Sequence, residues 1–120
     1  MKSRGYLTIS ILWMCIVWLV SSLPARELPQ VQIIGMDKAA HFFVYGVWAI
    51  LNRLYADSRF KDKIRFVITL LFLLAMAALD EYHQAFIPGR DVSFYDLVAN
   101  WTGIFCGWFG TILFLRRRVE

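Results

Sequence analysis

Four long apolar segments dominate the chain, and most charged residues lie between them or at the two ends. The segments cover approximately residues 6–23, 39–55, 64–86 and 94–115. A transmembrane helix needs roughly 20 mostly apolar residues, within a range of about 17–25. Helices at a water interface show one apolar stripe, whereas these are apolar on nearly every side, which is typical of lipid-facing helices. The pattern predicts an all-α protein, a four-helix transmembrane bundle that forms a single domain over residues 1–120.

The first segment has a basic start and could instead be a cleaved secretory signal. Its apolar run is longer than the usual signal core of about 7–15 residues. The sequence Leu23-Pro24-Ala25 is also a poor cleavage site. We therefore expect a retained helix, and cleavage would leave the other three spans oriented as before.

The composition agrees with a membrane environment. Apolar residues make up 59% of the chain and charged residues 18%, whereas soluble domains have about 45–50% and about 25%. The net charge of +4 does not indicate nucleic-acid binding, because the basic residues lie at the termini and in one central stretch. Cys15 and Cys106 fall inside apolar runs, where each is most simply a small apolar residue, and no disulfide framework is expected.

The charges also predict an orientation. Basic residues gather before the first span, around the second connection and after the last span: Lys2, Arg4, Arg53, Arg59, Lys61, Lys63, Arg65, Arg116, Arg117 and Arg118. The other two connections are mainly acidic: Glu27, Asp37, Asp80, Glu81, Asp91 and Asp96 accompany Arg26, Lys38 and Arg90. Cytoplasmic segments carry the excess of Lys and Arg. Both termini are therefore predicted to be cytoplasmic, with the acidic connections outside.

Polar side chains of the last three segments fall at one depth. Counted from the basic residue at the cytoplasmic end of each segment, His41, Asp80 and Asn100 lie at about 18–24 Å, at a rise of about 1.5 Å per residue. The hydrocarbon core is about 30 Å thick. The three helices therefore place polar groups in one layer near the outer boundary of the bilayer.

Helical spacing places these polar residues on particular faces. The faces comprise Asp37, His41 and Tyr45 in the second segment, Asp80 and Gln84 with Glu81 beside them in the third, and Asp96, Asn100, Gly103 and Gly107 in the fourth. Glycines four residues apart let another helix approach closely. Charged groups at membrane depth cost at least about 2.5–3.5 kcal/mol each. We therefore expect the faces to turn toward each other, where their groups pair, bind a ligand or line a wet cavity.

Two motifs resemble those of a known family. Asp37-Lys38-x-x-His41-Phe42-x-x-Tyr45 is similar to the first motif of the VanZ-like membrane proteins. Asp80-Glu81-x-x-Gln84-x-Phe86-x-Pro88-Gly89-Arg90, followed by Asp96, Asn100, Gly103 and Gly107, is similar to the second. The resemblance implies a four-helix protein of the bacterial plasma membrane that works near lipids of the cell envelope. The namesake of the family is associated with reduced susceptibility to teicoplanin, a glycopeptide that binds cell-wall precursors. The resemblance implies no particular reaction.

The first functional hypothesis is a protein that binds or processes a phosphate-bearing envelope lipid, such as a lipid-linked precursor. Lys38 and Arg90 would hold the head group, because Arg in particular suits phosphate. The acid–base candidates are His41, Asp80 and Glu81, further binding candidates are Gln84, Asn100 and Tyr45, and Asp37 and Asp96 would support the site. The sequence shows no nucleophile motif and no Gly-rich phosphate loop, so it names no reaction class.

No cofactor is expected. A divalent cation held by the acids and His41 is conceivable, and oxygen ligands with one imidazole suit manganese or magnesium better than zinc. Two alternatives stay open. One is a non-enzymatic module, a proton- or ion-binding subunit or small permease, which would need self-association, for instance through the glycine face. The other is a purely structural polar network, in which Arg90 pairs with Asp80, Glu81 or Asp96.

Overall fold

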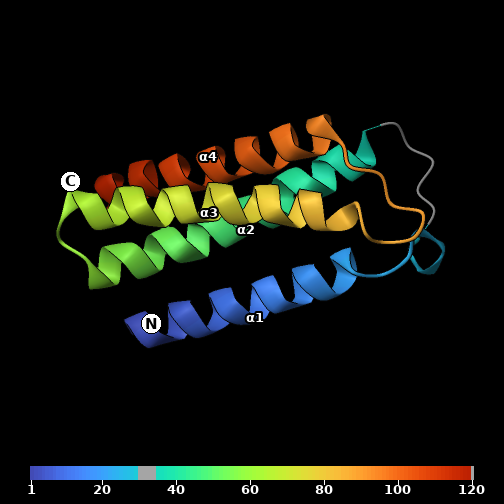
Figure 1. Ribbon diagram of the computed structural model, residues 1–120. Coiled ribbons are helices and arrows are strands. Elements are labelled where there is room, and N and C mark those ends of the chain that lie inside the picture. The colour runs from blue at the N-terminus through green and yellow to red at the C-terminus, as the bar shows by residue number, and fades with distance from the viewer. Residues whose placement is uncertain (30–34, 120) are drawn as a thin grey trace.

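The computed structural model describes residues 1–29 and 35–119. These residues form four α-helices and one short 3-10 helix, with no strand among them: α1 (Ser3–Ser21), η1 (Ala25–Glu27), α2 (Met36–Arg59), α3 (Lys63–Gln84) and α4 (Phe94–Arg117). The helices run alongside one another (Figure 1). Both termini and the α2–α3 turn lie at one end of the bundle, and the other two connections lie at the opposite end (Figure 1). The all-helical prediction is confirmed.

The exteriors of the helices are strongly apolar. By length and composition, α1 and α4 could cross a membrane. Large apolar side chains such as Leu19, Leu71 and Leu113 are more than half exposed on α1, α3 and α4. A soluble monomer rarely exposes such extended apolar surfaces. Within residues 1–29 and 35–119, α1 and α4 are the helices long and apolar enough to cross a membrane, so the other two spans remain a prediction.

The helix ends differ from the predicted spans where charged residues continue a helix. α2 begins at Met36 and ends at Arg59, about one turn beyond the predicted range 39–55 at each end. The added residues include the charged Asp37, Lys38, Asp57 and Arg59, which are compatible with helical backbone. At the start of α4, the Ser93 side chain accepts a hydrogen bond from the Asp96 amide, which is the usual role of an N-cap serine.

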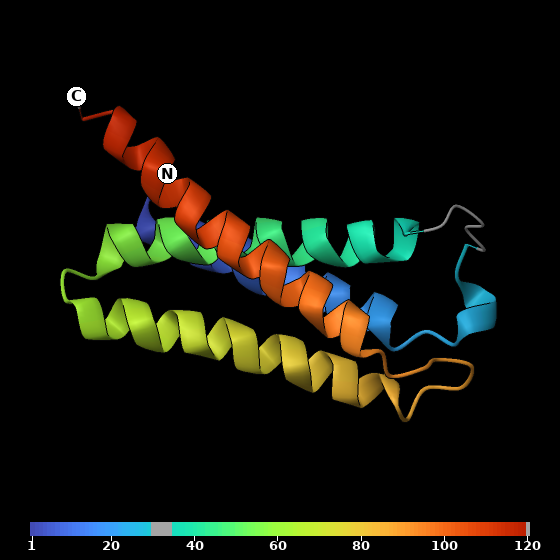
Figure 2. The ribbon, with the colours of Figure 1, turned by 90° about the horizontal axis from the view of Figure 1, so that it is seen from above.

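The closest packing in the bundle joins α2 to α4, which crosses it obliquely (Figure 2). A Cβ atom added to Gly103 would collide with the carbonyl oxygen of Phe42, and one added to Gly107 would collide with that of Gly46. Gly46 would likewise place a Cβ 3.3 Å from the Gly103 carbonyl oxygen. The predicted glycine face therefore contacts α2 of the same chain, and it is not free for self-association.

Helix α1 joins the bundle through polar groups and through Trp13, Met14 and Val17, which pack against the apolar core. Its buried residues are Ser10 and Ser21. Ser10 accepts hydrogen bonds from Trp48 Nε1 at 3.1 Å and from Asn52 Nδ2 at 2.8 Å. Trp13 Nε1 donates to the Val44 carbonyl at 3.0 Å. In lipid, an apolar side chain gains little by exchanging lipid contacts for protein contacts. Hydrogen bonds between helices therefore contribute more to holding them together.

Candidate functional site

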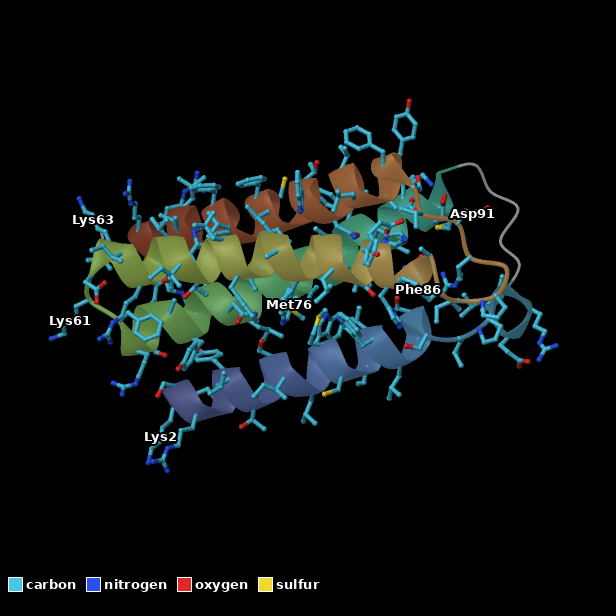
Figure 3. The ribbon with its side chains drawn as sticks, in the orientation of Figure 1. Lys2, Lys61, Lys63, Met76, Phe86 and Asp91 are labelled. Atoms are coloured by element: carbon cyan, nitrogen blue, oxygen red, sulfur yellow. The ribbon has the colours of Figure 1, made fainter. Side chains whose placement is uncertain are left out.

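The polar layer lies at the end of the bundle that carries the α1–α2 and α3–α4 connections. Figure 3 labels Phe86 and Asp91 at this end, and Lys2, Lys61 and Lys63 at the other. The candidate residues of α2, α3 and α4 do lie near the same end, as their depths predicted. They form two clusters, one around Asp80 and one around Asp96.

The first cluster surrounds Asp80, which is only 2% exposed. Ser21 of α1 donates its hydroxyl hydrogen to Asp80 Oδ1, and Tyr45 of α2 donates its own to Oδ2, each at 2.5 Å. Gln84 Nε2 donates to the Ser21 hydroxyl oxygen at 3.2 Å. One acid therefore ties three helices together, and Gln84 lies beside it on the same face of α3.

The second cluster joins the start of α2 to the start of α4. Lys38 Nζ lies 2.6 Å from Asp37 Oδ2 and 2.6 Å from Asp96 Oδ1. His41 Nδ1 lies 2.8 Å from Asn100 Oδ1, and His41 Nε2 lies 3.8 Å from Asp96 Oδ2. An amide oxygen only accepts, so this contact has His41 Nδ1–H as the donor. The imidazole is thereby oriented between α2 and α4.

The ion pairs keep Lys38 charged. Lys38 and Asp37 lie in the first turn of α2, before the predicted span. Hydrogen bonds from Lys38 to Asp37 and then to Asp96 raise the pKa of Lys38 to about 12. The hydrogen bond from Lys38 lowers the pKa of Asp37 below its usual 3.8. Lys38 is therefore a cation at neutral pH, and the two carboxylates compensate its charge.

Glu81 turns away from its neighbour Asp80 and toward the second cluster. Its Oε1 accepts a hydrogen bond from the Ser93 amide at 2.8 Å, and it interacts electrostatically with Asp96 and His41. Within the described part of the chain, Glu81 Oε2 and Asn100 Nδ2 are buried without a hydrogen-bond partner. Adjacent residues of a helix point about 100° apart, which explains why the two acids belong to different clusters.

Arg90 lies outside both clusters. Its Nη2 donates to the Val20 carbonyl at 3.0 Å, and its Nε donates to the Leu23 carbonyl at 3.2 Å. These are the carbonyls at the end of α1, a place where Arg commonly satisfies free backbone acceptors. Among the described residues Arg90 pairs with no acid, so the pairing with Asp80, Glu81 or Asp96 that the structural-network hypothesis included is not formed.

A cavity of about 680 Å³ lies between α1 and α2 and reaches the Asp80 cluster. Its apolar wall includes Trp13, Ile16, Val17, Val20 and Val44. Its polar lining includes Ser21, Asp37, His41, Tyr45, Asp80, Gln84 and Arg90. The candidate residues that do not line it are Lys38, Glu81, Asp96 and Asn100. The cavity therefore has an apolar wall on one side and part of the predicted site on the other. His41 belongs both to this polar lining and to the second cluster.

A comparison of the whole sequence with known families gives one decisive result. Residues 6–115 match the sequence profile of the VanZ/LLP1 family. The chain belongs to this family. No curated protein and no solved structure gives a significant match to it. Membership of the VanZ/LLP1 family, together with the apolar helices α1 and α4, indicates a membrane protein.

Sequence reasoning missed Ser21, which anchors the Asp80 cluster in this VanZ/LLP1 protein. A signal was present, because Ser10 and Ser21 are eleven residues apart, which is close to three helical turns and places both on one face. It also left out His83, whose ring stacks on Trp18 with centroids 4.9 Å apart. His83 does not line the cavity.

Among residues 1–29 and 35–119, no three His, Cys, Asp or Glu side chains are grouped to hold a metal ion.

Proposed function

We propose that this VanZ/LLP1 protein spans the bacterial plasma membrane four times, with both termini cytoplasmic, and binds a phosphate-bearing envelope lipid from the outer leaflet. The charge distribution supports the orientation, since the basic termini and the α2–α3 turn lie at one end of the bundle (Figure 1). The polar cavity is near the opposite end. A lipid of the outer leaflet would therefore meet the cavity at the depth of its own head group.

The cavity between α1 and α2 is the observation that carries this proposal. Its volume of about 680 Å³ lies within the range of about 300–1,000 Å³ that is usual for ligand sites. The apolar wall suits part of an acyl or isoprenoid chain. Polar side chains from α1, α2 and α3 and the guanidinium of Arg90 meet at the end nearest the connections. This combination fits an amphiphile better than a soluble metabolite.

Arg90 is the better phosphate ligand of the two candidate cations. The charge of Lys38 is compensated by Asp37 and Asp96. Arg90 has five N–H donors, and the carbonyls of Val20 and Leu23 engage it only through Nε and Nη2. The planar guanidinium group of Arg90 is thus held in place by neutral carbonyl acceptors. Its remaining N–H groups can donate to a phosphate oxygen. Lys38 would instead position His41 and Asp96.

A reaction at this site would use His41, which lines the cavity. The hydrogen bond to Asn100 fixes its ring, and Asp96 Oδ2 lies 3.8 Å from Nε2. His41 would then be the acid or base toward a bound head group, with Asp80 and Glu81 as neighbouring acids. If the bound lipid carries a cell-wall precursor, the protein would change how much target is available to a teicoplanin-type glycopeptide.

A non-enzymatic proton-binding module is a second candidate, because Glu81 is buried with one carboxyl oxygen unpartnered among the described residues. Such an atom is costly when charged. Protonation of Glu81 would relieve this cost without any lipid ligand. The binding measurement below separates the two candidates.

The test is binding of phosphatidylglycerol by the detergent-purified protein, followed by native mass spectrometry. We expect saturable binding of one lipid, and Arg90→Gln should weaken it about tenfold or more, because loss of one partner of a charge pair commonly has at least this effect. The matched control is Arg26→Gln, since Arg26 pairs with Glu27 and does not line this cavity. Equal binding by wild type and both variants would refute the proposal.

A further inference from the structure

Two ionisable residues of the cavity, one acidic and one basic, form no ion pair among the described residues. Within residues 1–29 and 35–119, Asp80 forms no ion pair with a Lys, Arg or His, and Arg90 forms none with an acid. Both residues line the same cavity. The remaining acid on its wall, Asp37, is paired with Lys38 at 2.6 Å.

The partners of Asp80 are two neutral hydroxyl groups. Both of its oxygens accept hydrogen bonds, one from Ser21 and one from Tyr45. The hydroxyls satisfy the lone pairs of Asp80 but bring no positive charge. Buried charges are normally paired, and an acid at membrane depth by default indicates a site with a partner.

The basic side chains of the described residues near the cavity are engaged elsewhere. Lys38 contacts Asp37 and Asp96, and the ring nitrogens of His41 face Asn100 and Asp96. Arg90 contacts the end of α1. The compensating cation for Asp80 would therefore come from the ligand.

We propose that the cavity selects a zwitterionic amine-bearing phospholipid, with its phosphate on Arg90 and its ammonium on Asp80. This inference rests on the proposed function and narrows its ligand to lipids of the phosphoethanolamine class. Arg90 and Asp80 belong to one short stretch, the last turns of α3 and the turn that follows it. Gln84 lies between them in sequence and also lines the cavity, where it offers a polar surface to the linker between the two charges.

Competition between two lipids with identical acyl chains tests the proposal by native mass spectrometry. The wild-type protein should bind phosphatidylethanolamine about tenfold more tightly than phosphatidylglycerol, because a buried hydrogen-bonded charge pair commonly contributes at least this factor. Asp80→Asn should remove the preference, because phosphatidylethanolamine binding should fall to the level of phosphatidylglycerol binding. Asp91→Asn, which changes charge equally near the same end of the bundle but at a residue that does not line the cavity, should leave the preference intact.

A second arm needs no variant and so does not depend on the folding of Asp80→Asn. N-acylated phosphatidylethanolamine lacks the ammonium charge, and the wild-type protein should bind it no better than phosphatidylglycerol. Soluble glycerophosphoethanolamine should compete poorly, because it cannot fill the apolar wall. Effective competition would show that the ligand is the free head group and would overturn the lipid assignment.

The outcomes distinguish this inference from the proposed function. Equal or tighter binding of phosphatidylglycerol by wild type would refute the selection of a zwitterion and leave the proposed function standing. A preference that survives Asp80→Asn would also refute it, because the ammonium would then lie elsewhere. Saturable binding of neither lipid would refute both.

Discussion

Ser21 and Tyr45 each donate a hydroxyl hydrogen bond to one oxygen of Asp80. The hydroxyls come from α1 and α2, so this single carboxyl fixes the positions of three helices at the polar end of the bundle. In lipid no water replaces a lost partner, and an unsatisfied buried acceptor keeps its full desolvation cost. The hydroxyl groups are therefore as important to this end of the bundle as its charges.

Ser21→Ala should lower the free energy of unfolding by about 1–3 kcal/mol, the usual cost of leaving a buried acceptor unpaired. The neighbouring Ser22 is the control, because its exposed hydroxyl bonds only to the Trp18 carbonyl of its own helix. Ser22→Ala should have an effect within about 0.5 kcal/mol. Denaturant titration in mixed micelles measures both. Equal effects of the two variants would show that the Ser21–Asp80 bond does not hold α1.

For single residues, the sequence predicts which polar side chains lie at the same depth in the bundle. It does not predict which groups they contact. The separation of Asp80 from Glu81 follows from helical geometry alone. The partner of Arg90 does not, because the carbonyls at the end of α1 carry no sequence signature, whereas the acids near Arg90 are conspicuous. Ser21 was overlooked for a related reason, since a serine in an apolar run resembles a tolerated small residue until its partner is known.

The contact between α2 and α4 is the closest between elements. Gly46, Gly103 and Gly107 bring the two backbones together, and this approach places Asn100 against His41. Close approach at small residues favours helix association in membranes, where packing replaces the hydrophobic effect. The glycine face of α4 was recognisable from its spacing. Its partner helix was not, because spacing alone does not distinguish packing within a chain from packing between chains.

Gly103→Ala should destabilise the bundle by about 1–3 kcal/mol, the usual cost of overpacking a tight contact, because its Cβ would overlap the Phe42 carbonyl oxygen. Gly110, on the same helix, has nothing within 4 Å of an added Cβ. Gly110→Ala should be neutral or stabilising by up to about 1 kcal/mol through helix propensity. Thermal unfolding followed by circular dichroism compares the pair. A destabilised Gly110→Ala with an unaffected Gly103→Ala would mean that α4 packs through another face.

In the whole molecule, the polar clusters and a group of basic residues lie at opposite ends of the bundle. The polar clusters lie near the end that carries the α1–α2 and α3–α4 connections, and the basic residues Lys2, Lys61 and Lys63 lie at the other end (Figure 3). The number and order of the helices could be predicted from hydrophobicity, because every apolar run became one helix. The cavity could not, since it depends on how α1 packs against the other helices, and the hydrogen bonds of Ser10 and Ser21 in that contact follow from no pattern of apolar residues.

The proposed orientation predicts which loops are accessible from outside the cell. In a background with Cys15→Ser and Cys106→Ser, a cysteine in place of Asp91 should react with a membrane-impermeant maleimide in intact cells. One in place of Lys61 should react only after permeabilisation, because the α2–α3 turn carries the basic residues that the positive-inside rule assigns to the cytoplasm. Both positions are labelled in Figure 3, at opposite ends of the bundle. The reverse labelling pattern would place the cavity near the inner leaflet, and an outer-leaflet lipid could then not be its ligand.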